Sequence, residues 1–282
     1  MLIHMQQVRL IADSGGTKAD WALIVDGVVS STFSTRGINP IALGDEDVYS
    51  ILRSELLPHL GQFQPVSVSF YGAGCRPSQF ARMEHLLSTV LPGIRHVSVS
   101  SDLLGAARAL FGGSRGIACI LGTGANSGFY DGHCITHAMP ALGYAIGDEG
   151  SGASLGKRLV ADVFKRQLPP TVCQAFSDEF RLNADQLVEN VYRRPAANRY
   201  LASFVPFISS HLSCPELHNL VLSDFEAFFR RNVLPLSLPY EPIGFVGGVA
   251  HHFAPLLRQA AANCGLSIAS IIERPFEQLE NL

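Results

Sequence analysis

The stretch LIADSGGTKADWALIVDG, residues 10–27, decides the fold. An apolar run from residue 8 ends at Asp13, and the glycine-rich turn SGGTK follows at once. A second apolar run then leads to the pair Asp26 and Gly27, which is a strong signal for a hairpin between two strands. The sequence therefore predicts that the chain opens with a meander of three strands.

The same pattern begins again near residue 115. GIACILGTG (116–124) predicts a buried strand, and the segment after it predicts a hairpin turning at Asp131 and Gly132. In both halves, hydrophobic periodicity predicts alternating strands and helices after the meander. The predicted helices are 46–60, 77–91, 103–111, 251–265 and a short one from Pro275, and the predicted strands are 66–74, 95–102, 241–250 and 266–272. This repetition predicts duplicated α/β domains with a mixed sheet in each.

Composition narrows the classes of function. The 282 residues are 47% hydrophobic and 16% charged, which suits two compact domains. A net charge of -3 gives no basic field for nucleic acid, so we expect no nucleic-acid partner. No apolar run is long enough to span a bilayer and no secretory signal stands at the N-terminus, so we expect no membrane partner and a cytoplasmic location.

Two strand-to-hairpin turns are rich in glycine, DSGGTK (13–18) and LGTGAN (121–126). Glycine lets backbone amides approach phosphate oxygens, and threonine adds a hydroxyl donor. A tight hairpin alone would also explain each turn. Two such turns at corresponding positions of a duplicated unit favour a polyphosphate. GTGANSG lacks the helix that follows a dinucleotide fingerprint, and GASLGKR (152–158) has the wrong spacing for a phosphate loop.

Four motifs in order resemble one superfamily. They are DSGGTK, LGTGAN, GDEGSG (147–152) and GFVGGVA (244–250). Together they resemble the sugar-kinase, Hsp70 and actin superfamily, and within it the group of N-acetylglucosamine kinases and BadF/BadG-type ATPases. The resemblance implies two ribonuclease H-like (actin-like ATPase) domains, each with a mixed five-stranded sheet flanked by helices, and a cleft between them.

The resemblance also implies domain boundaries. The first domain would span 1–110, joined by the C-terminal helix 275–282, and the second 111–274, with a helical insertion at about 154–234. It allows for a homodimer, in which that insertion would form the dimer interface.

By resemblance, ATP and Mg²⁺ are the cofactors. Asp13 would orient toward magnesium through water. Residues of three motifs would bind the phosphates and the nucleoside of ATP: Gly15, Gly16, Thr17, Lys18, Gly122, Thr123, Gly124, Gly247 and Gly248.

Asp102, at the end of a predicted strand, stands where these kinases keep their general base. Phosphoryl transfer needs one carboxylate within hydrogen-bonding distance of the acceptor hydroxyl, because that hydroxyl loses its proton as it attacks phosphorus. Ser101 or Asp102 would in addition cap the following helix. The residues that would contact the sugar are Asn39, Asp102, Leu142, Gly143 and Asp148.

Local roles compete with two of these assignments. Asn39 precedes Pro40 and suits a turn, and Asp148 suits the acidic first turn of a helix. Animal N-acetylglucosamine kinases have a tryptophan where this chain has Leu142.

The expected function is an ATP-dependent sugar kinase acting on N-acetylglucosamine at its 6-position. Glucosamine and N-acetylmuramic acid stay open as acceptors, because the residues that discriminate them are scattered. A partner-directed ATPase of the BadF type and a sugar-binding regulator without activity are the alternatives.

Overall fold

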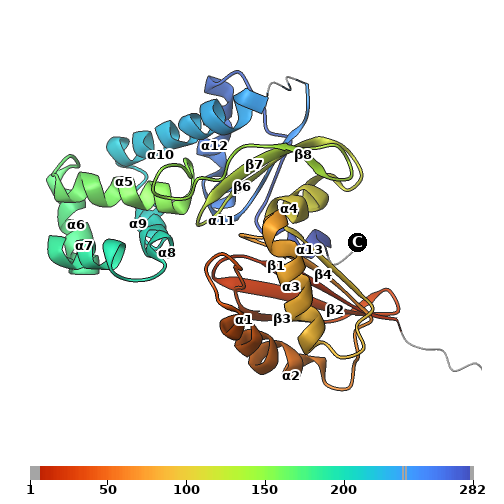
Figure 1. Ribbon diagram of the computed structural model, residues 1–282. Coiled ribbons are helices and arrows are strands. Elements are labelled where there is room, and N and C mark those ends of the chain that lie inside the picture. The colour runs from red at the N-terminus through yellow and green to blue at the C-terminus, as the bar shows by residue number, and fades with distance from the viewer. Residues whose placement is uncertain (1–6, 237, 239, 280–282) are drawn as a thin grey trace, which may run out of the picture. The chain divides into compact units, whose positions relative to one another are not determined.

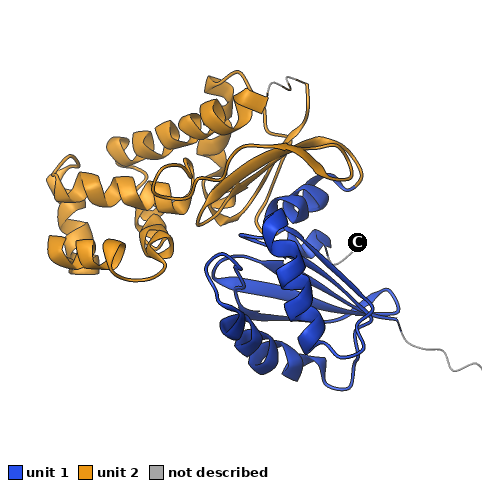
Figure 2. Cartoon of the chain, viewed as in Figure 1, with its two compact units in different colours: residues 1–112, 275–282 blue, residues 113–274 orange. Residues whose placement is uncertain are grey.

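The computed structural model describes residues 7–236, 238 and 240–279, and Figure 1 shows the helices and strands that they form. The chain divides into two compact units (Figure 2). Unit 1 comprises residues 1–112 and 275–282, and unit 2 comprises residues 113–274.

Unit 1 contains a mixed five-stranded sheet in the order β3-β2-β1-β4-β5. The first three strands form the predicted meander, with antiparallel pairing throughout, while β1, β4 and β5 run parallel. The strands are β1 (Val8–Ser14), β2 (Lys18–Val25), β3 (Val28–Arg36), β4 (Ser67–Gly72) and β5 (His96–Ser101). The helices are α1 (Asp45–Ile51), α2 (Leu57–Leu60), α3 (Pro77–Val90), α4 (Asp102–Phe111) and α13 (Phe276–Leu279), with a π-helical turn η1 (Leu52–Leu56) between α1 and α2.

Alternation along β1 explains how this sheet buries both of its faces. Leu10 and Ala12 belong to the cluster that includes residues of α1 and α3, whereas Ile11 belongs to a smaller cluster with residues of α13. Side chains of successive strand residues point to opposite faces, so a strand that is apolar throughout needs cover on both. Trp21 of β2 is fully buried, and its indole N–H donates to Thr35 Oγ1 at 3.0 Å.

Unit 2 repeats the sheet in the order β10-β9-β6-β7-β8. Its strands are β6 (Gly116–Leu121), β7 (Ala125–Tyr130), β8 (Ile135–Ala138), β9 (Ile243–Val246) and β10 (Ser270–Ile272). Between β8 and β9 come α5 (Gly152–Phe164), α6 (Pro170–Phe180), α7 (Ala184–Tyr192), α8 (Ala197–Ala202), α9 (Val205–Ser210), α10 (Pro215–Phe228), η2 (Phe229–Val233) and η3 (Leu234–Leu236). The helices α11 (Gly248–His252) and α12 (Ala254–Asn263) follow β9. The two mixed five-stranded sheets flanked by helices confirm the predicted fold class.

Across the part of the chain that the structure describes, no helix combines the length and the apolar character needed to cross a membrane.

Candidate active site

The candidate site in unit 1 lies at one edge of its sheet. Ser14 pairs with Gly72, and Gly72 pairs with Ser101, so the carboxyl ends of the parallel strands β1, β4 and β5 meet there. Ligands of open α/β sheets bind at this edge. Asp13 lies one residue before the end of β1, and Asp102 directly follows β5. The fold therefore brings to one edge two carboxylates that are 89 positions apart in the printed sequence.

The turn between β1 and β2 is held in place by the segment after β3. Buried Ser14 accepts a hydrogen bond from the Ile38 N–H at 2.8 Å and donates from its hydroxyl to the Ile38 carbonyl at 3.1 Å. The Gly37 N–H donates to the Thr17 carbonyl at 2.9 Å. Sequence reasoning missed Ser14 and Gly37 as supports of this turn, since nothing in their local pattern shows which segment they contact.

Within the turn, Gly15 donates its N–H to the Lys18 carbonyl at 2.9 Å, as a tight hairpin requires. Thr17 and Lys18 are exposed. The Lys18 ammonium forms an ion pair with Asp20 at 2.8 Å, so in this structure it is engaged by its own strand. An exposed pair of this kind is weak, on the order of 0–1 kcal/mol, and a phosphate could compete for the ammonium.

Asp13 is a half-buried carboxylate, and no positive charge or hydrogen-bond donor among the described residues lowers its pKa. Burial, together with the nearby charges of Asp102 and Asp20, raises the pKa of Asp13 to about 7. No hydrogen bond is among the causes. A carboxylate in this condition fits a cation, because a positive charge would remove the repulsion that now disfavours its ionised form.

The donor set suits a hydrated cation. Among the described residues, no group of three or more His, Cys, Asp or Glu side chains is close enough to hold a metal ion. Mg²⁺ commonly keeps several waters and binds through one or two carboxylates together with substrate phosphates. Asp13 therefore fits a magnesium ion that is held mainly by water and phosphate oxygens.

Asp102 is the first residue of α4. Ser101 caps this helix, since its hydroxyl accepts from the Leu104 N–H at 3.3 Å. The sequence did not decide whether Ser101 or Asp102 caps this helix. The prediction that Asp102 is the cap is wrong, because Ser101 is the cap. Asp102 Oδ1 accepts from the Leu103 N–H at 2.8 Å. Burial raises the pKa of Asp102 to about 6, and backbone hydrogen bonds oppose that rise.

Asn39 lies in the loop that follows β3, in the turn that its position before Pro40 suggested. Its Oδ1 accepts from the Ile41 N–H at 3.0 Å, which leaves the amide nitrogen as the group able to contact a ligand. The side chain packs on Gly74, which has a φ of 75°, and a Cβ at Gly74 would collide with Asn39 Oδ1. Arg82 of α3 holds the same loop by donating to the carbonyls of Pro40 at 2.5 Å and Leu43 at 2.9 Å.

In unit 2, the turn between β6 and β7 meets the start of α11. Gly122 donates its N–H to the Gly124 carbonyl at 3.0 Å. Gly247 has a φ of 121°, and a Cβ there would collide with the Leu121 carbonyl, so only glycine allows this approach. Beside Gly248 the space is open. Two motifs that are about 120 positions apart, LGTGAN and GFVGGVA, therefore lie against one another.

Asp148 lies beside the same turn. A Cβ at Gly124 would come within 3.1 Å of Asp148 Oδ2, and the Ala125 N–H donates to the Asp148 carboxylate. Burial raises the pKa of Asp148, and the hydrogen bond from Ala125 opposes the rise. Because α5 begins at Gly152, Asp148 is outside the helix, and the alternative of an acidic first turn is wrong.

Leu142 and Gly143 precede this loop. Leu142 is 57% exposed, and Gly143 accepts at its carbonyl from the Gly147 N–H at 2.9 Å. Leu142 and Asp148 both line a cavity of about 280 Å³, together with Asn126, Met139 and Ile146 among others. An apolar wall with a few polar groups is typical of small-molecule sites.

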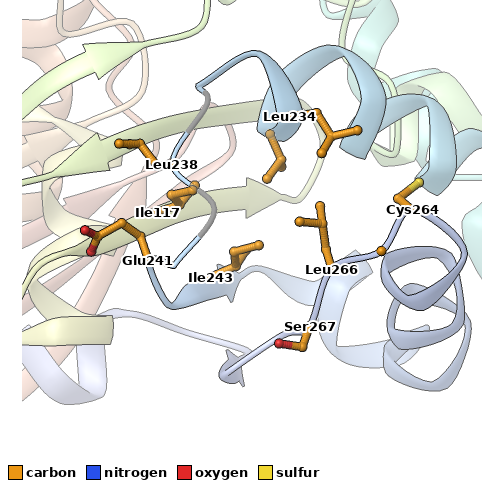
Figure 3. Close-up of a pocket in the computed structure, with 10 residues that line it drawn as sticks. Ile117, Leu234, Leu238, Glu241, Ile243, Cys264, Leu266 and Ser267 are labelled. Carbon is orange, nitrogen blue, oxygen red and sulfur yellow. The ribbon is translucent and has the colours of Figure 1, made fainter.

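A larger cavity, of about 530 Å³, lies elsewhere in unit 2 (Figure 3). It is lined mainly by apolar side chains, including Ile117 and Ile243 near the amino ends of β6 and β9. Its carboxylate, Glu241, is already paired with Arg115 at 2.5 Å. The glycine-rich turn leaves β6 at the other end, so this cavity is separate from the candidate site.

Two solved structures are similar to this chain over almost its whole length. A solved structure of a protein from Porphyromonas gingivalis, provisionally named an N-acetylglucosamine kinase, is 43% identical to this chain, with 96% of each chain covered and a TM-score of 0.93. A protein from Chromobacterium violaceum with the same provisional name is 20% identical, covers 97% of this chain and 98% of its own, and has a TM-score of 0.78.

More distant structures share the fold alone. A ROK family glucokinase from Streptomyces griseus, solved with glucose and AMPPNP, is 14% identical, with 97% of each chain covered and a TM-score of 0.58. No family model and no curated protein matches the chain. Identity of 43% over almost the whole of both chains shows common descent with the Porphyromonas protein, and the chain therefore belongs to its family, the sugar kinases of the actin-like ATPase fold.

Proposed function

We propose that the protein transfers the γ-phosphoryl group of ATP to the 6-hydroxyl of N-acetylglucosamine, with Mg²⁺ as cofactor. The observation that carries the proposal is the pair of half-buried carboxylates Asp13 and Asp102 at the carboxyl edge of one sheet, both with raised pKa values. Phosphoryl transfer needs a group that accepts the proton of the acceptor and a cation that neutralises phosphate charge. The 43% identity to the Porphyromonas protein supports the amino-sugar acceptor.

The roles follow from the surroundings of each residue. Asp102 accepts the proton of the attacking hydroxyl, and its hydrogen bond from Leu103 fixes the direction of the carboxylate. The amide of Asn39 and the carboxylate of Asp148 contact sugar hydroxyls, and Leu142 and Gly143 line the sugar pocket. The magnesium ion would supply charge neutralisation at the phosphates, with Asp13 orienting its water ligands.

Residues of three glycine-rich motifs bind the nucleotide, mainly through their backbone. The turn residues Gly15, Gly16, Thr17 and Lys18 bind the phosphoryl group that is transferred. Gly122, Thr123 and Gly124 bind the other phosphates, and Gly247 and Gly248 lie against the nucleoside. The glycines have no side chains, which lets backbone amides approach anionic oxygens at short distance.

The test is a coupled assay of ADP release across hexoses and amino sugars. N-acetylglucosamine should stimulate turnover most, ahead of glucosamine, N-acetylmuramic acid and glucose, and the product should carry phosphate at its 6-position. If another sugar stimulated turnover most strongly, that sugar would be assigned as the acceptor, and the proposal that the protein is a sugar kinase would still hold. Lack of stimulation by every sugar would contradict the proposal.

Substitution of Gly74 should weaken sugar binding selectively. In Gly74→Ala, the new Cβ would displace the Asn39 side chain, and the φ of 75° would add backbone strain. We expect KM for the sugar to rise by about tenfold or more, with KM for ATP little changed. Gly44→Ala is the matched control from a neighbouring loop, because its Cβ would meet only ordinary contacts and its φ is -73°. Equal sugar KM values in the two variants would argue against a role for Asn39.

Activity should depend on pH through Asp102. With a pKa of about 6, its carboxyl group is protonated at lower pH and cannot accept the proton of the hydroxyl. We therefore expect kcat/KM for the sugar, at saturating ATP and Mg²⁺, to be level above pH 7 and to fall about tenfold per unit well below pH 6. A profile that stays level down to pH 5 would contradict the role of Asp102 as base.

A further inference from the structure

Asp224, on α10, is the one acidic side chain that is fully buried within the described part of the chain, with 4% exposure. Its Oδ2 accepts from the Gly150 N–H at 2.8 Å. Its Oδ1 accepts from the Ser154 hydroxyl at 3.2 Å and from the Arg158 guanidinium at 3.1 Å. A carboxylate is costly to bury, so a site that retains one and satisfies both oxygens needs an explanation.

Two partners of Asp224, Gly150 and Ser154, directly precede α5 or lie in its first turn, and Arg158 lies one turn further along the helix. Ser151 caps this helix by accepting from the Ser154 N–H at 3.1 Å. A negative charge at the amino end of a helix is favourable, because the free N–H groups of the first turn give that end a positive partial charge. Asp224 therefore fixes where α5 begins, although it comes from a segment 70 residues further along the chain.

The start of α5 also holds the second glycine-rich turn, Gly122–Gly124, in place. The Gly152 N–H donates to the Gly122 carbonyl at 2.8 Å, and the Ala153 N–H donates to the Thr123 carbonyl at 3.1 Å. These bonds point the carbonyls of the turn toward the helix. A shift of the helix start would therefore shift the turn.

We propose that Asp224 is a positioning residue for nucleotide binding. It holds the start of α5 in place, and α5 holds the turn Gly122–Gly124 in the conformation that binds phosphate. The proposal rests on the proposed function of that turn. Asp224 does not contact the nucleotide and acts only through the helix.

The direct test is Asp224→Asn in the full chain. The amide keeps the volume of the side chain and replaces one acceptor oxygen by a donor, so either the Gly150 N–H or the Arg158 guanidinium, neither of which can accept, loses its partner. We expect the Kd of a non-hydrolysable ATP analogue, measured by calorimetry with Mg²⁺, to rise about tenfold. KM for the sugar should rise less than the Kd of the analogue, because Asn39 and Asp102 belong to the other unit and only Asp148 lies beside this turn.

Arg158→Met is the matched control. This substitution removes the ion pair between Arg158 and Asp224, but the hydrogen bond from the Gly150 N–H to Asp224 remains. Both variants should melt at a lower temperature than the wild type, whereas only Asp224→Asn should lose nucleotide affinity. Parallel loss of nucleotide affinity in both variants, or wild-type affinity in Asp224→Asn, would overturn the positioning role.

A second variant covers the case in which Asp224→Asn does not fold. Ser154→Ala removes the donor that lies in the first turn of α5 and should raise the Kd of the ATP analogue about two- to threefold, and wild-type affinity there would overturn the proposal. Calorimetry with the analogue needs no acceptor sugar. Failure of the proposed sugar kinase activity would therefore be seen separately, as absence of sugar-stimulated ADP release.

Discussion

Asp102→Asn is expected to lower kcat for sugar phosphorylation by about 100-fold or more, with the fold intact. The amide cannot take the proton of the acceptor hydroxyl, so that proton has to leave without a positioned base. The substitution should not disturb α4, because Ser101 caps the helix and the oxygen of the new amide can still accept from the Leu103 N–H. Steady-state kinetics with saturating ATP and sugar measure the effect.

Asp185→Asn provides the matched control for this result. Asp185 also lies in the first turn of a helix, α7, and it is exposed. The control should keep wild-type turnover, and both variants should keep wild-type circular dichroism. Near-normal kcat in Asp102→Asn would show that another group accepts the proton, or that the step needs no base.

Asp13→Asn should abolish turnover that depends on magnesium and ATP while sugar affinity stays close to that of the wild type. The carboxylate lacks a hydrogen-bonding partner among the groups that set its pKa, and we assign its charge to the hydrated cation. Removal of the divalent cation with EDTA should stop the wild-type enzyme in the same way. Asp26→Asn in the hairpin is the control, because an amide oxygen there can still accept from the Gln7 N–H.

Sugar affinity separates a metal role from a general structural one. It is measured by calorimetry without nucleotide, and a loss of sugar affinity as large as the loss of turnover would mean that Asp13 has been misassigned.

Asp13→Asn should also change the thermal stability of the protein in metal-free buffer. The pKa of Asp13 is about 7 in the folded protein and near 3.8 in an unfolded chain, so the unfolded state loses its proton first as pH rises. The destabilisation due to Asp13 therefore begins near pH 4 and is complete above pH 7. Asp13→Asn should melt several degrees above the wild type at pH 8, and the difference should shrink at pH 5. A melting temperature below that of the wild type at pH 8 would contradict this account.

Local patterns in the sequence were sufficient to predict the elements of the fold. Apolar runs broken by Asp26-Gly27 and Asp131-Gly132 predicted both meanders, and the repetition predicted two mixed sheets. The glycine-rich turns were also visible, because they sit directly between two strands. Hairpins and amphipathic helices are determined by neighbours in the chain, and the residues that specify them are therefore adjacent or regularly spaced.

Only the tertiary structure decided which groups support the site. Asn39 could be quoted from the sequence, but Gly74 and Arg82, which hold it, come from segments that have no motif of their own. Asp224 looks like any acidic residue of an amphipathic helix until the fold buries it against the start of α5.

The environment of the carboxylates was likewise decided by the fold. Asp13 and Asp102 have raised pKa values because the sheet places both of them at one half-buried edge. Burial and the distance between charges depend on segments that are far apart in the chain, and no local spacing encodes them. The sequence thus determined the strands, turns and candidate residues, while long-range packing determined which carboxylates are buried with raised pKa values and what holds them there.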